Sequence, residues 1–363
     1  MQKKAQATLQ TDTPCYNKDM AENEIQKTAT ISIPDLILNY VEPVRFETAC
    51  RSCSKYGVGS ACPPHDFNVV KWWSRFACLD LYAVSIPGDA DWDEADKRLS
   101  DRLLVLERAV PESLCLLSGS SGGKEGEAVR YSIQSLGGNV EKLCRELLSI
   151  SLQWPKEGTD PGRLTLVGGL LRSKRGPDVR PMETKDLILR ESLAEDISRF
   201  SEWEAEDAVK EYFSIEDDQT PQQVEQIFWE DRKNEERKQY TIVLKRTGEP
   251  IGRIVMNDLQ PGWKAEIFRI YIGDPALRGN GYGRQAMEAL LALCFEEWKV
   301  ERVYLDHYTG NPAGRLYLDL GFRYEGVLRK NCRKNGQLYD VHLMSMLRPE
   351  YEEAVSRYGS VNL

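Results

Sequence analysis

The chain has 363 residues, of which 41% are hydrophobic and 29% charged, and it carries a net charge of -9 at pH 7. This length is enough for about two domains of ordinary size, and the composition is that of a globular protein. The acidic balance excludes a general nucleic-acid binder that relies on a basic face, so no nucleic-acid partner is expected.

The start of the chain is polar, and residues 1–28 are expected to form a flexible tail. Its residues lack the apolar core of a signal peptide, and no apolar run reaches the roughly 20 residues that cross a bilayer. We therefore expect a cytoplasmic protein with no membrane partner. Residues 31–38 follow as an extended stretch that Pro34 interrupts.

A cysteine cluster comes next, in which Cys50, Cys53 and Cys62 lie within thirteen positions. Two cysteines three apart on a tight turn place both sulfurs within reach of one zinc ion, at about 2.3 Å, and a third cysteine adds a third ligand. His65, Cys78 or Cys115 would supply the fourth. We predict zinc or an iron–sulfur group at Cys50, Cys53, Cys62 and Cys115. The alternative is a loop with small buried side chains, since free cysteine is commonly buried.

The segment from Cys50 to His65, which ends in Cys62-Pro63-Pro64, resembles the signature of a bacterial family of predicted metal-binding proteins. A fainter similarity continues through residues 131–137. Members of that family usually carry a second cysteine cluster, whereas this chain has Cys115 alone, followed by serines and glycines. The resemblance implies a Cys-rich α+β metal-binding domain over residues 29–172, and the departure argues against a complete four-cysteine iron–sulfur site.

The rest of this half is predicted to be scaffold. Apolar residues recur at helical spacing in 95–110 and 140–152, and residues 164–171 are typical of a strand. The composition then changes abruptly, and residues 173–181 predict a linker. A second domain is expected at residues 182–355.

The second domain alternates strands and helices. Strands are predicted at 186–191, 240–244, 251–256, 266–272 and 302–306, with a closing hairpin at 326–347 around Asn335-Gly336, and helices at 193–203, from 284 onward and from 311 to 321. In the strand 266–272, Phe268, Ile270 and Ile272 are expected on one face. This order predicts an α/β (α+β) fold with a mixed central sheet flanked by helices.

A glycine-rich turn, Arg278-Gly279-Asn280-Gly281-Tyr282-Gly283, joins the strand 266–272 to the helix after it. Glycine permits positive φ and a close approach of the backbone, and the first amides of a helix have no partner within it. The pattern therefore predicts a phosphate cradle, to which Arg278 and Arg284 add positive charge. Such a turn taken alone is also compatible with a simple loop.

Three segments together resemble the GNAT superfamily of acyl-CoA-dependent N-acyltransferases. They are Arg278-x-x-Gly281-x-Gly283 after a strand, Asn311 with Leu316–Phe322, and Glu325–Arg329 with its hairpin. The last is typical of the branch that contains ribosomal-protein and spermidine N-acetyltransferases. The resemblance implies acetyl-CoA as cosubstrate and an amine as acceptor. It also implies a set of CoA contacts: Arg278, Gly279, Asn280, Gly281, Tyr282, Gly283 and Arg284 on the pyrophosphate, and the backbone of Ile270 and Ile272 on the pantetheine arm.

The resemblance places the general acid at Tyr317, whose phenol can donate a proton to the departing sulfur. A core aromatic is the alternative for this position. Asn311 is implied to bind CoA, although it equally suits a helix cap. The general base stays open among Glu266, acting through a water, Asp306 and His307, and we favour Glu266.

Residues 191–230 carry thirteen acidic side chains against two basic ones. Such a run is usually a solvated face, but it would also attract a cationic amine. The sequence thus predicts a transferase that acetylates a small amine, a polyamine or a protein N-terminus, fused to a metal-binding module. The alternative is a metal- or redox-responsive regulator whose second domain only binds CoA. Homo-oligomer formation is left open.

Overall fold

The computed structural model forms two compact units that divide between Arg180 and Pro181. The described residues are 25–54, 56–58, 61–119, 129–152, 162–174, 179–213, 215, 219–334 and 336–358. Several sequence predictions fall partly outside these ranges: the tail up to residue 24, residues 120–123 after Cys115, residues 175–178 of the linker, and Asn335 of the closing hairpin.

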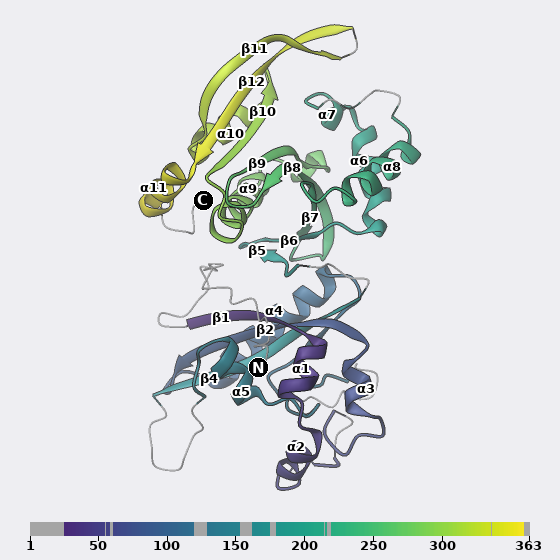
Figure 1. Cartoon of the computed structure of the whole chain (residues 1–363), viewed down its shortest axis with the longest axis vertical. Helices are drawn as coiled ribbons and strands as arrows, with labels where there is room; N and C mark the ends of the chain where they lie inside the picture. Colours follow the sequence, from purple (N-terminus) through teal and green to yellow (C-terminus); the bar gives the residue numbers. More distant parts are fainter. Residues whose placement is uncertain are drawn as a thin grey trace, which may run out of the picture. The chain divides into compact units, whose positions relative to one another are not determined.

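The first unit contains a four-stranded antiparallel sheet (Figure 1). In spatial order its strands are β1 (Ile25–Ser32), β2 (Phe76–Pro87), β4 (Arg163–Ser173) and β3 (Ser113–Leu116). Because β1 begins at Ile25, residues 25–28 are strand and not tail. β2 is buried from Leu79 to Ile86. The charged residue within that stretch, Asp80, is compensated by Arg172 of β4, whose Nε lies 2.8 Å from its carboxylate.

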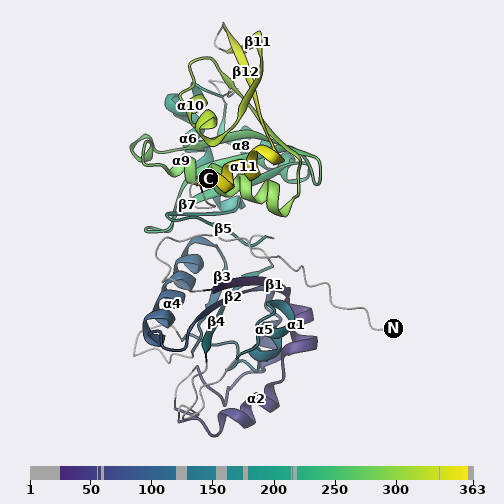
Figure 2. The same ribbon diagram turned by 90° about the vertical axis from the view of Figure 1, so that its left-hand side faces the viewer.

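Helices cover both faces of this sheet (Figure 2). On one face lies α4 (Trp92–Ala109), whose Arg102 stacks over the ring of Tyr82. The other face shares a hydrophobic core with α1 (Ile33–Tyr40), α3 (Val69–Trp73) and α5 (Val140–Leu147). α2 (Pro43–Cys50) leads from α1 toward the cysteine segment. The unit is therefore a three-layered α+β fold.

Residues 33–40 form a helix, and the predicted extended conformation there is wrong. Pro34 occupies the first turn of α1, where its missing N–H has no helical partner to lose. The Oγ of Ser32 accepts a hydrogen bond from the amide of Asp35 (3.2 Å) and caps the helix. Proline thus starts this helix, whereas the sequence interpretation treated it as an interruption.

The second unit is built on an eight-stranded sheet (Figure 1). Its spatial order is β11 (Arg323–Lys334), β12 (Gln337–Leu347), β10 (Arg302–Tyr308), β9 (Lys264–Ile272), β8 (Glu249–Gln260), β7 (Lys238–Leu244), β6 (Leu187–Glu191) and β5 (Met182–Glu183). Neighbouring strands pair antiparallel except β9 and β10, which are parallel. This confirms the mixed central sheet that the sequence predicts.

Helices flank this sheet on both faces. The main core packs the sheet against α9 (Tyr282–Ala292) and α10 (Ala313–Leu320), and α9 continues into a π-helical turn at Leu293–Glu297. A smaller core on the other face includes residues of α6 (Ile197–Ala205), α7 (Asp207–Lys210) and α8 (Pro221–Arg232). The last helix is α11 (Arg348–Tyr358). Within the described ranges, none of the helices combines the length and the apolar composition that crossing a bilayer requires.

Candidate active site

β9 and β10 are paired over only part of their length. Their parallel register comprises Arg302 with Lys264, Val303 with Ala265, and Tyr304 with Glu266. Beyond the last pair, β9 continues to Ile272 and β10 to Tyr308, while each stays paired with its outer neighbour. The edge of β9 that faces β10 is therefore unpaired beyond Glu266, in the middle of the sheet. This unpaired edge includes Ile270 and Ile272. An extended ligand arm could pair with such an edge as an added strand.

A β-bulge on β9 lies at this opening. In the pairing of β8 with β9, Val255 faces Arg269 and Met256 faces Ile267, so Phe268 is the extra residue. Phe268 is 46% exposed, whereas Ile270 and Ile272 pack on the core with α9. The expectation that these three side chains share one face is wrong, because the bulge changes the alternation of the strand.

The glycine turn follows β9 directly. Gly279 and Gly281 have φ angles of +77° and +81°, and a Cβ added to either would meet nothing within 4 Å. These glycines are needed for their backbone conformation, and the space beside them is open. Gly281 is the N-cap of α9, whose first-turn amides include those of Tyr282 and Gly283. The turn thus directs backbone donors and the positive end of a helix dipole to one open place.

The polar side chains of the turn are engaged with the protein. The guanidinium of Arg278 donates to the carbonyls of Ile272 (3.0 Å) and Ala208 (3.1 Å). Asn280 donates through Nδ2 to the carbonyl of Leu277 (3.0 Å). Arg284 lies 3.8 Å from the carboxylates of Glu288 and Asp319. Arg278 and Asn280 therefore hold the shape of the turn, and the open groups for an anion are backbone amides.

Tyr317 lies on α10 and is 6% exposed, with its ring 6.0 Å from that of His307. Burial raises the pKa of its phenol to about 12, and the nearby carboxylate of Asp306 adds to the effect. The phenol therefore stays protonated at neutral pH and can donate its proton. Asn311 accepts a hydrogen bond at its Oδ1 from the amide of Ala313, the first residue of α10 (2.9 Å).

Glu266 stands at the point where β9 and β10 part. Its Oε2 accepts a hydrogen bond from Nδ2 of Asn257 on β8 (2.8 Å). Burial raises the pKa of Glu266, and the negative charges of Asp306 and Asp258 raise it further, against the effect of Asn257. Strand alternation puts Glu266 on the sheet face opposite the core that contains Tyr317. A carboxylate with a raised pKa is a better proton acceptor.

The two alternative bases lie in different surroundings. His307 is 6% exposed, its Nδ1 lies 3.0 Å from the carbonyl oxygen of Tyr308, and its ring stacks on that of His342 at 5.0 Å. Burial lowers the pKa of His307. Asp306 is exposed, yet the protein atoms around its carboxyl group raise its pKa. His307 is thus a packed residue under α10, and Asp306 shares the face of Glu266.

Cys53 and Cys62 lie close enough to Cys50 to affect its pKa, whereas the fourth predicted ligand, Cys115, lies in β3. Burial raises the pKa of the Cys50 thiol, and the neighbouring thiols of Cys53 and Cys62 raise it further. Cys115 lies in β3, where burial raises its pKa to about 12 and where its Sγ lies 3.6 Å from Nη1 of Arg130. His65 places its Nε2 2.6 Å from the carbonyl oxygen of Ser135. Among the described residues, no group of three or more His, Cys, Asp or Glu is arranged to hold a metal ion.

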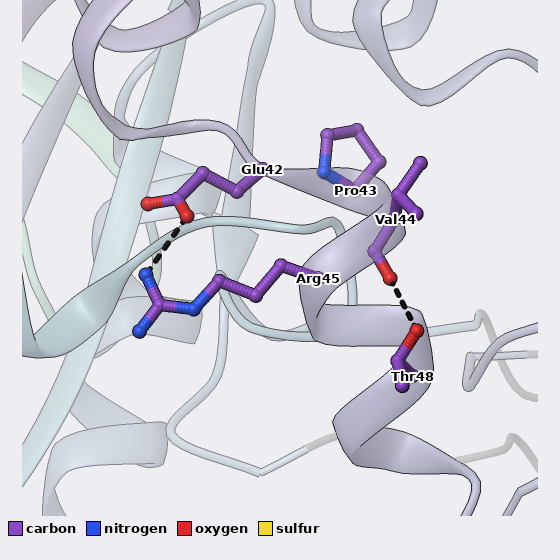
Figure 3. Close-up of a pocket in the computed structure, with 5 residues that line it drawn as sticks. All are labelled: Glu42, Pro43, Val44, Arg45 and Thr48. Carbon is purple, nitrogen blue, oxygen red and sulfur yellow. Dashed lines mark hydrogen bonds and ion pairs between the residues drawn. The ribbon is translucent and has the colours of Figure 1, made fainter.

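A surface hollow of about 580 Å³ lies at the start of α2 in the first unit (Figure 3). It is lined by Glu42, Pro43, Val44, Arg45 and Thr48. Its polar groups satisfy one another, since Arg45 pairs with Glu42 (2.8 Å) and Thr48 donates to the carbonyl of Val44 (2.8 Å) (Figure 3). The hollow contains none of the predicted site residues.

The second unit thus has an open strand edge in a mixed sheet, a glycine turn with open backbone amides directly after it, and acid and base candidates on the two faces. These are the parts that an enzyme needs to transfer an acyl group from a CoA thioester. Residues 186–323 match the family model described as acetyltransferase (GNAT) domain. The C-terminal region of the chain is a GNAT acetyltransferase domain, and the protein is an acetyl-CoA-dependent N-acyltransferase.

Several proteins named as N-acetyltransferases are similar to this chain. The uncharacterized N-acetyltransferase YoaA of Bacillus subtilis (strain 168) is 29% identical over 173 residues, which are 46% of this chain and 97% of YoaA. The L-amino acid N-acetyltransferase AaaT of Escherichia coli (strain K12) is 23% identical over 33% of this chain and 75% of its own. A crystal structure of spermidine N-acetyltransferase from Vibrio cholerae with CoA and spermine is 22% identical, with a TM-score of 0.43, over 47% of this chain and 99% of that one.

Proposed function

We propose that the second unit transfers the acetyl group of acetyl-CoA to a primary amine at the gap between β9 and β10. The observation that carries this proposal is that the two strands part after the pair Tyr304–Glu266, immediately before the glycine turn. The pantetheine arm would lie along the edge of β9 at Ile270 and Ile272. The pyrophosphate would bind the amides of the turn from Gly279 to Arg284. Asn311 would reach CoA through its Nδ2, since its Oδ1 already accepts the amide of Ala313.

The proposed chemistry uses one proton acceptor and one proton donor. Glu266 accepts a proton from the amine through a water, and the free amine attacks the thioester carbon. The new C–N bond forms, the tetrahedral oxyanion is held by an amide of β9, and the C–S bond then breaks. Tyr317 gives its proton to the departing thiolate, and the second proton that the nitrogen loses as the amide forms returns through water to the phenolate. The raised pKa of Tyr317 keeps its phenol proton available at neutral pH.

A panel of amines tests this function, with acetyl-CoA as donor and release of free thiol as the signal. The panel should contain small monoamines, polyamines, amino acids and peptides with a free N-terminus. We expect transfer to at least one class. Tight binding of acetyl-CoA without transfer to any amine would instead favour the alternative, a regulator whose second unit only binds CoA.

For the first unit we propose metal binding by the thiols of Cys50, Cys53 and Cys62. The support is the spacing of the three cysteines in the sequence, together with the effect of Cys53 and Cys62 on the pKa of the Cys50 thiol. The fourth predicted ligand, Cys115, is buried in β3 beside Glu107 and Arg130 and would have to leave that position to join them. Metal analysis of the purified chain, compared with Cys53→Ser, tests the proposal. Equal metal content in both proteins, or none in either, would refute it.

A further inference from the structure

A buried cluster of charged side chains lies on the sheet face that carries Glu266. At its centre is Glu204 of α6, whose Oε1 accepts hydrogen bonds from Arg253 (2.7 Å), Arg269 (2.9 Å) and the hydroxyl of Tyr271 (2.9 Å). Although burial alone would raise the pKa of Glu204, the guanidinium groups of Arg269 and Arg253 lower it. The carboxylate is therefore ionised at neutral pH.

The charges of this cluster do not cancel. In the described part of the chain, the ion pairs of both Arg253 and Arg269 go to the same carboxylate, that of Glu204. Among the side chains that the structure describes, two guanidinium groups against one carboxylate leave one positive charge in excess. The side chains are 1%, 12% and 2% exposed for Arg253, Arg269 and Glu204, so this charge is shielded from water. An uncompensated charge in such a place is costly, and an anion would relieve the cost.

Of the two arginines, Arg269 is the more exposed, at 12% against 1% for Arg253. Arg253 is enclosed, with its guanidinium over the ring of Phe200 (4.3 Å) and bonded to Gln239. Arg269 uses Nη1 on Glu204, which leaves donors of its planar fork for a second partner. Its guanidinium lies 5.6 Å from the ring centroid of the exposed Phe268.

The position of Arg269 relates it to the proposed reaction. Arg269 pairs with Val255 and Glu266 with Asn257, so the two side chains flank the bulge on the same face of β9. They are about 7 Å apart along the strand, at the usual rise for two paired steps. A group that binds an anion thus lies beside the group that accepts the proton of the amine.

We propose that the acceptor is a primary amine that also carries a carboxylate, as a free amino acid does, and that Arg269 binds this carboxylate. The inference rests on the proposed function, because it takes the gap at Glu266 as the site of transfer. The guanidinium fork matches a carboxylate in two parallel hydrogen bonds, and Phe268 offers an apolar surface to the rest of the acceptor. A polyamine would bring further positive charge against Arg269. The site therefore selects a zwitterionic acceptor over a polycation.

Three matched acceptors test this: an α-amino acid, its carboxamide and the amine that lacks the carboxyl group, each assayed with acetyl-CoA. The comparison is repeated for amino acids with different side chains. In each set of three, we expect the unmodified enzyme to show the highest kcat/KM with the amino acid. Arg269→Gln should lower kcat/KM for the amino acid about 10- to 100-fold, mainly through KM, because a charge-assisted hydrogen bond is lost. The carboxamide and the amine should change little, and so should the KM for acetyl-CoA. Arg269→Lys should restore part of the loss, and Arg199→Gln, which removes an exposed arginine of α6, should change none of these values.

The possible outcomes distinguish a failure of this inference from a failure of the proposed function on which it rests. Equal losses on all three acceptors in Arg269→Gln would make Arg269 a purely structural residue and overturn the inference. A preference of the unmodified enzyme for the amine without a carboxylate would overturn it as well, while leaving the N-acetyltransferase function intact. Binding of acetyl-CoA without transfer to any amine would remove the function itself, and the inference with it. Because the comparison of acceptors needs no variant, a folding defect in Arg269→Gln does not prevent the test.

Discussion

Tyr304 of β10 faces Glu266 of β9 in the last residue pair that joins these two strands. Up to this pair the sheet is continuous, and beyond it the edge of β9 is open. Glu266 therefore lies where the gap between β9 and β10 begins. Its carboxyl group is on the same face of the sheet as Asp306 and Arg269. One residue pair thus fixes both the place where an acyl chain can enter the sheet and the position of the favoured base.

Tyr317→Phe is expected to lower kcat by about 10- to 1000-fold and to leave the Kd for acetyl-CoA unchanged. In the proposed mechanism the phenol hydroxyl acts only on the departing thiolate, and the ring of the variant keeps its packing against the ring of Phe322. Steady-state kinetics and calorimetric titration with acetyl-CoA measure the two quantities. Full turnover of Tyr317→Phe with the best amine would remove Tyr317 from the mechanism.

The pH dependence of kcat/KM should report the protonation of the Glu266 carboxylate. Its pKa is raised, so the base becomes protonated and inactive at a higher pH than an ordinary glutamate, and the rate falls as the pH drops through that value. Asn257 opposes this shift by donating to the ionised carboxylate. Asn257→Ala is therefore expected to move the acidic limb to higher pH.

Glu266→Gln provides the control for this limb. It should remove the acidic limb and lower kcat/KM by about 100-fold or more. An acidic limb that stays in place in Glu266→Gln would transfer the role of base to Asp306, the exposed carboxylate on the same face.

Gly281→Ala is expected to weaken acetyl-CoA binding. Alanine at a φ of +81° costs about 1–2 kcal/mol, and relaxation of the turn would move its amides. We expect the Kd for acetyl-CoA to rise about 5- to 30-fold. The matched control is Gly262→Ala in the β8–β9 turn, where φ is +78° and the added Cβ also meets nothing within 4 Å. That variant should lose similar stability and keep its Kd, and an equal change of Kd in both would contradict the assignment.

Asp80→Ala should strongly destabilise the first unit. It leaves Arg172, which is 2% exposed, without its carboxylate, and breaking such a buried pair costs about 3–5 kcal/mol. Chemical denaturation measures the loss. Arg145→Ala, which removes a half-exposed pair with Glu146, should leave the midpoint of unfolding unchanged. Similar midpoints for the two variants would show that the Asp80 pair adds little.

Features that depend on local sequence could be predicted. The turn from Arg278 to Gly283 is recognisable because glycine is required at positive φ, and Gly281 does begin α9. The end of α10 at Gly321, with φ of +103°, follows from the same preference. The apolar spacing after the turn predicts α9, although the π-helical turn at Leu293–Glu297 is not visible in it.

Features that depend on distant partners could not be predicted. The acidic run was expected to be a solvated face, yet Asp196 and Glu204 are 2% and 3% exposed. They are buried because Arg190 of β6 pairs with Asp196 and Arg253 of β8 pairs with Glu204, and the second pair joins residues 49 positions apart. The bulge at Phe268 likewise arises from the register between β8 and β9. The sequence around Arg269 gives no sign that this side chain is buried beside a carboxylate. That carboxylate, of Glu204, comes from α6, and only the folded structure brings it to β9.

The sheet of the second unit is held together across its centre by three residue pairs of β9 and β10. A cosubstrate whose arm lies in the gap would supply backbone hydrogen bonds that the chain itself does not make there. Its binding would then stabilise the folded state by mass action, in addition to providing the acetyl group. The lifetime of such an enzyme in a cell would then depend on the concentration of acetyl-CoA. A shortage of acetyl-CoA would lower the amount of folded enzyme as well as the rate of the reaction.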